Sequence, residues 1–70
     1  MITKGSKITI IPSQQLTEFR LDSLLGETGY VLEDLTSIPR KAKGYMAFFP
    51  VPYQEEYLWF IPQESVYEQD

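Results

Sequence analysis

Residues 57–66 read YLWFIPQESV and open with five large apolar or aromatic side chains in a row. A strand at the surface of a small protein buries one face and exposes the other, so its apolar residues normally alternate with polar ones. Here both faces of the strand are apolar. The stretch GYMAFFP, residues 44–50, repeats the pattern. The two segments predict strands that place one apolar face in the core and need a cover for the other.

The alternation divides each strand into two sets of side chains. We expect Trp59 and Ile61 to lie nearer the core, although the sequence leaves open which set of residues 44–49 faces inward. The sets in that strand are Tyr45, Ala47 and Phe49 against Met46 and Phe48. The inward set is expected to pack with Ile8, Ile10 and Val31.

The sequence leaves two possibilities for what buries the second apolar face. One is the segment 13–27, folded across the sheet. The other is a partner, either a second copy or a different protein, because large exposed apolar patches mark interaction surfaces. Covering about five large side chains would contribute about 1.5 to 3 kcal/mol each, which is large for a small domain. The apolar residues of the segment are Leu16, Phe19, Leu21, Leu24 and Leu25, with all but Leu25 expected to form the cover.

The rest of the chain predicts three more strands. Residues 4–12 form the first, and residues 27–36 contain the second, which starts at Gly29. The third strand, residues 44–49, is expected to end at Pro50 and Pro52, because proline cannot donate to a β-ladder. The fourth, residues 57–61, should stop at Pro62. Residues 63–65 suit a 3₁₀ turn, and residues 66–68 form a short fifth strand.

The segment 13–27 is the least regular. It could hold a helix of two to three turns with Ser13 or Thr17 as N-cap. We favour a long loop with one helical turn at residues 22–25, capped by Asp22 and ended by Gly26. The chain is therefore expected to be all-β, a small five-stranded antiparallel barrel with a long loop after the first strand.

These segments resemble SH3-like and KOW-like barrels. KGSKITII (4–11) followed by LLGETGYVLED (24–34) looks like their opening, with Gly26, Gly29 and Val31 in the turn into the second strand. WFIPQESV (59–66) is similar to the close of the SH3 barrel, a strand, a proline, a 3₁₀ turn and a valine strand. The resemblance implies fold more than function. The peptide-binding SH3 family places a tryptophan at the start of its third strand, and here Trp59 lies in the fourth.

Size and composition restrict the classes of function. The 70 residues are expected to form one domain, 1–70, without cysteine or histidine, at a net charge of −4. This composition predicts a folded cytoplasmic protein with no cofactor, no metal and no membrane segment. The acidic balance argues against general nucleic-acid binding. The neighbouring carboxylates Glu33/Asp34 and Glu55/Glu56 should point to opposite faces, so an acid/base dyad is not expected.

The remaining signal is aromatic. We expect a non-enzymatic protein-interaction module that binds a partner or itself through Tyr53, Tyr57, Trp59 and Tyr67. One alternative is KOW-like binding of nucleic acid or the ribosome through the loop of Arg40, Lys41 and Lys43. Another is an acidic mimic of nucleic acid that blocks a DNA-binding protein.

Overall fold

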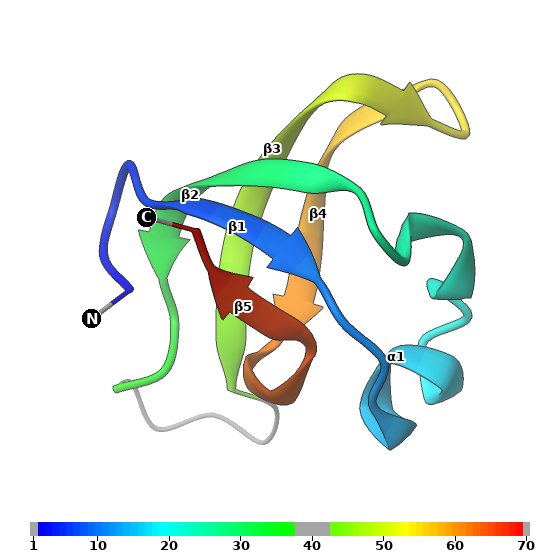
Figure 1. The fold of residues 1–70 in the computed structure, drawn as a ribbon, viewed down its shortest axis with the longest axis horizontal. Coiled ribbons are helices and arrows are strands. Elements are labelled where there is room, and N and C mark those ends of the chain that lie inside the picture. The colour runs from blue at the N-terminus through cyan, green and yellow to red at the C-terminus, as the bar shows by residue number, and fades with distance from the viewer. Residues whose placement is uncertain (1, 38–42, 70) are drawn as a thin grey trace.

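A computed structural model describes residues 2–37 and 43–69 (Figure 1). Most of the regular secondary structure in this part of the chain is β-structure, with one short α-helix and two 3₁₀ helices. In chain order the elements are β1 (Lys7–Ile10), α1 (Gln14–Glu18), η1 (Asp22–Leu24), β2 (Thr28–Asp34), β3 (Gly44–Tyr53), β4 (Glu56–Pro62), η2 (Gln63–Ser65) and β5 (Val66–Glu68).

The strands form one antiparallel sheet in the order β4-β3-β2-β1-β5. The strands β4 and β5 are its two edges, and closure of the sheet into a barrel is not detected in the described ranges. Figure 1 shows β5, β1 and the start of β2 in front of the long β3–β4 hairpin, with α1 and η1 at one side. The five strands and their antiparallel pairing agree with the sequence-based expectation.

The sheet changes direction within β2. Its first residues pair with β1, and the pairing with β3 shifts register between Val31 and Glu33. Such a bulge bends a strand and increases its twist. Nearby, Gly29 lies under the Phe49 ring, because a Cβ on Gly29 would come within 2.8 Å of Cε1 of Phe49. The bulge and this close approach let both halves of the sheet contribute to one core.

The core contains the strand residues that the alternation indicated. Ile61 is fully buried, and Trp59 is partly buried against the core. The question left open in residues 44–49 is settled in favour of Tyr45, Ala47 and Phe49. The complete buried cluster is Ile8, Ile10, Leu16, Leu21, Leu24, Val31, Tyr45, Ala47, Phe49 and Ile61.

The prediction that β3 ends at Pro50 is wrong. The strand runs on through Pro50 and Pro52 to Tyr53. The ladder is nevertheless interrupted there, since the register of β3 on β4 shifts between Phe48 and Tyr53. An extended backbone suits the fixed φ of proline, and what proline loses is only the donated hydrogen bond. The two prolines therefore break the pairing without ending the strand.

The segment 13–27 holds more helix than the favoured prediction allowed. The helix α1 begins after Ser13, whose Oγ accepts a hydrogen bond from Leu16 N at 3.1 Å. Of the two candidate N-caps, Ser13 is therefore the one that caps this helix. The helical turn at Asp22 is confirmed as η1, but Asp22 does not cap it; its Oδ1 accepts from Thr17 Oγ1. The predicted 3₁₀ turn and fifth strand are confirmed as η2 and β5.

Replacing Gly44 by alanine should destabilise the protein by about 1 to 3 kcal/mol, because the added methyl group overpacks a tight contact. A Cβ at Gly44 would lie against the Ile61 carbonyl oxygen and 2.8 Å from Cζ of Phe60. Urea unfolding measures the effect. Val51→Ala, at a side chain that is 68% exposed on the same strand, is the control and should change stability by less than about 0.5 kcal/mol.

Replacing Glu55 by glycine should stabilise the protein by about 0.5 to 1 kcal/mol. The two residues between Tyr53 and Glu56 have positive φ, 51° at Gln54 and 65° at Glu55, a conformation that strains a side chain with a Cβ. Glu64→Gly removes the same charge at a position without positive φ, and it should destabilise. Equal urea midpoints for the two variants would contradict this account of the turn.

Candidate functional site

We call the side of the sheet that faces away from the core the outer face. It carries two rows of side chains. Residues paired across antiparallel strands point to the same side, so each row can be followed from strand to strand. The first row is Tyr30, Phe48 and Leu58, and the second is Glu33, Met46 and Phe60. Apart from Glu33, each of these side chains is apolar or aromatic.

Much of this apolar surface reaches the solvent. Tyr30 is 38% exposed and Leu58 is 44% exposed, while Met46, Phe48 and Phe60 are half-buried by their neighbours. Tyr57 joins the first row, because its ring stacks on the Phe48 ring with 5.8 Å between centroids. The outer face is therefore an apolar layer over β3 and β4 that reaches β2 at Tyr30, with Glu33 at its β2 end.

The segment 13–27 does not cover the outer face. Its residues Leu16, Leu21 and Leu24 are buried in the core cluster on the opposite side of the sheet. Phe19, which follows α1, is the exception, since its ring lies 6.1 Å from the Phe60 ring and touches one end of the face. The expectation that this segment covers the second face is thus wrong for the three leucines.

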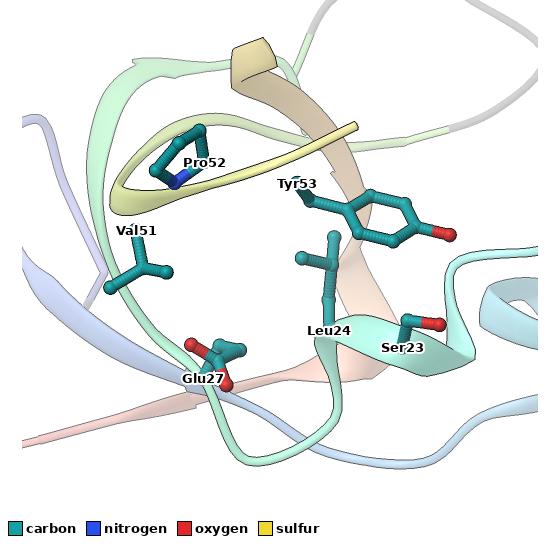
Figure 2. Close-up of a pocket in the computed structure, with 6 residues that line it drawn as sticks. All are labelled: Ser23, Leu24, Glu27, Val51, Pro52 and Tyr53. Carbon is teal, nitrogen blue, oxygen red and sulfur yellow. The ribbon is translucent and has the colours of Figure 1, made fainter. Parts of the chain in front are cut away.

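Tyr53 and Trp59 meet at the end of the β3–β4 hairpin. Their ring centroids are 5.3 Å apart, and Trp59 Nε1 donates a hydrogen bond to the Glu56 carbonyl oxygen at 3.0 Å. Tyr53 also borders a hollow of about 200 Å³ between the hairpin and η1 (Figure 2). The hollow is lined by Ser23, Leu24, Glu27, Val51, Pro52 and Tyr53.

The structure separates the four aromatic residues predicted to bind a partner. Tyr53 and Trp59 touch, and Tyr57 stacks on the outer face. Tyr67 is 64% exposed on β5, at the sheet edge opposite β4. Tyr30 and Leu58 were missed as candidate site residues. The signal at Tyr30 was its alternation with the buried Gly29 and Val31, and at Leu58 its alternation with Trp59, but alternation indicates exposure only once the core face is known.

The basic loop proposed for nucleic acid is only partly described. Lys43 is exposed and borders a second hollow of about 240 Å³ with Gln15, Gln63 and Glu64. Arg40 and Lys41 lie outside the described residues. Both hollows are smaller than the 300 Å³ or so typical of small-molecule sites.

The carboxylates of β2 point to opposite sides of the strand, as their adjacency predicted. Glu33 is paired with Met46, and Asp34 is paired with Tyr45. Over residues 2–37 and 43–69, no cluster of acidic residues could hold a metal ion, and no helix is long and apolar enough to cross a membrane.

Two groups at this end of β2 have shifted pKa values. Hydrogen bonds from the side chain and then the backbone N–H of Thr36, at 2.6 and 2.9 Å, lower the pKa of Asp34. Burial, followed by the negative charges of Asp34 and Glu68, raises the pKa of Tyr45.

The chain matches no protein-family model, and neither a curated protein nor a solved structure matches it.

Replacing Asp34 by asparagine should flatten the acid side of the stability profile. Because the folded-state pKa of Asp34 lies below its ordinary value of 3.8, its stabilising contribution is complete above that value. The contribution is lost as the pH falls through the lower folded-state pKa. Urea unfolding between about pH 6 and about pH 2 should show the parent losing more stability below about pH 4 than the variant. Parallel profiles would rule out this role for the Thr36 hydrogen bonds.

Proposed function

We propose that this chain is a non-enzymatic protein-interaction module that binds a protein surface through the outer face. The observation that carries the proposal is the pair of largely apolar rows on β2, β3 and β4. These rows remain partly exposed because the leucines of the segment 13–27 pack into the core on the other side of the sheet. Exposed apolar patches of several hundred Å² mark interaction sites. Tyr30 and Tyr57 add side chains with an apolar ring and a polar tip, which are enriched at interfaces.

The shape of the outer face supports a protein, and not a small molecule, as its ligand. The outer face is a layer of side chains on three paired strands, and the two hollows lie elsewhere in the described chain. Small molecules bind in concave sites that enclose most of their surface. A broad apolar layer instead suits the complementary surface of another folded chain.

We also propose that the sheet belongs to the SH3-like barrels. The strand order, the long loop between β1 and β2 and the 3₁₀ helix before β5 support this assignment. The loop departs from peptide-binding SH3 domains, which use an acidic long loop beside an aromatic groove. Here three leucines of the loop enter the core. We therefore assign binding to the outer face and not to a proline-rich peptide groove.

The test is capture of partners from a lysate of the producing organism, quantified by mass spectrometry. The bait is the parent chain or Leu58→Asp, a change at an exposed position of the outer face. A protein retained by the parent should be reduced at least tenfold by Leu58→Asp, because a carboxylate in an apolar contact costs more than about 1.4 kcal/mol. Far-ultraviolet circular dichroism should show both baits folded.

Val51→Asp is the matched control, since it places the same charge on an exposed apolar residue beside the Tyr53 hollow. It should leave capture unchanged. Loss of the partner with Val51→Asp but not with Leu58→Asp would move the site to the Tyr53 hollow and overturn the proposal. Salt-sensitive binding of RNA or DNA by the purified chain would instead favour the alternative through Lys43 and its neighbours.

A further inference from the structure

We propose that the occupant of the outer face is a second copy of this chain, so that two sheets pack face to face across a two-fold axis. The inference rests on the proposed function, because it takes the outer face to be a protein-binding surface. It goes further by naming the occupant and the relative orientation of the two chains.

The size of the apolar layer supports a folded partner with a sheet face. A large side chain that is two-fifths exposed leaves on the order of 80 Å² in water. Together with the half-buried side chains, the outer face offers on the order of 500 Å², close to the apolar share of the ~800 Å² that each partner buries in a standard interface. The side chains that contribute are Phe19, Tyr30, Met46, Phe48, Tyr57, Leu58 and Phe60.

At the β1–β2 side of the outer face, the two rows begin with side chains of opposite charge. Lys7 on β1 pairs with Tyr30 and so extends the first row, while Glu33 stands at the β2 end of the second row. Both side chains are exposed. The first row therefore begins with a cation and the second with a carboxylate, and each is followed by apolar residues.

This arrangement is self-complementary for one choice of axis. A two-fold axis that crosses the strands between the two rows places the first row of one copy on the second row of the other. Each strand then faces its own copy, so that Phe48 faces Met46, Leu58 faces Phe60 and Tyr30 faces Glu33, with each contact made twice. Lys7 lies one strand beyond Tyr30, on the side of the Glu33 carboxylate of the other copy. The apolar rows meet, and unlike charges meet at the rim.

The other simple axis is unfavourable. An axis along β3 would place Glu33 of each copy on the Phe60 ring of the other, where the neighbouring side chain on β3 is the uncharged Met46. In the first orientation the same carboxylate lies on Tyr30, with the cation Lys7 on the neighbouring strand. The rim charges thus select one orientation, as electrostatic complementarity commonly does at interfaces. Two sheets in the selected orientation keep their strands nearly aligned, as sheets packed face to face do.

The test is the molar mass of the purified chain by light scattering and sedimentation velocity, from about 1 µM to about 1 mM. We expect a reversible monomer–dimer equilibrium in this range. Leu58→Asp should leave a folded monomer throughout, and Val51→Asp should dimerise like the parent chain. A parent that stays monomeric up to the highest concentration, or a dimer that Leu58→Asp leaves intact, would overturn the proposal.

A charge reversal tests the orientation. Lys7→Glu and Glu33→Lys should each weaken dimerisation by about fivefold, because each change creates two like-charge contacts per dimer. The double variant exchanges the two charges and should recover the parent affinity. No recovery in the double variant would overturn the proposed axis.

The two proposals fail differently. A monomeric parent that captures a lysate protein, and loses it with Leu58→Asp, would refute the second copy and support the outer face as a site for another protein. A parent dimer disrupted by Leu58→Asp supports both proposals at once, since the bound protein is then the chain itself.

Discussion

Burial of Leu16, Leu21 and Leu24 against the inner side of the sheet is the interaction on which the rest of this structure depends. A fully buried leucine contributes about 1.5 to 3 kcal/mol, and a domain of this size has only a few kcal/mol of net stability. The chain has no cysteine or histidine, so neither a disulfide nor a zinc site replaces that contribution. The loop must therefore pack inward, and it is no longer available to cover the outer face.

Hydrogen bonds at both ends of the segment hold it in this path. At its start, Ser13 caps α1 and its hydroxyl is paired with that of Ser65, a fully buried residue. At its end, Gly26 N donates to the Ile10 carbonyl oxygen at 2.9 Å, and φ of +82° at Gly26 turns the chain back toward β2. The local polar contacts anchor the loop to β1 and η2, and the leucines between them fill the core.

The sequence was informative wherever a rule of local geometry decided the outcome. The alternation of Trp59 and Ile61 with their neighbours predicted the core side of β4, and Pro62 predicted the break before η2. The path of residues 13–27 was less predictable, because an apolar loop gains similar free energy on either side of a sheet that is apolar on both. That choice depends on how side chains fill the inner side of the sheet, where the Phe49 ring already lies against Gly29, and only tertiary packing reveals this. The candidate site was missed at Tyr30 for the same reason.

Both faces of this sheet are apolar, but the segment 13–27 can bury only one of them. One loop can fill one side, and after its leucines are placed inside, Phe19 still reaches the other. The outer side chains reduce their exposure by packing on one another, as in the stacking of Tyr57 on Phe48 and the contact of Phe60 with Gly44. Side chains that already pack on one another have less conformational freedom to lose when a partner covers them. In the dimer that we propose, the apolar rows would supply the affinity, and Lys7 and Glu33 would supply the orientation.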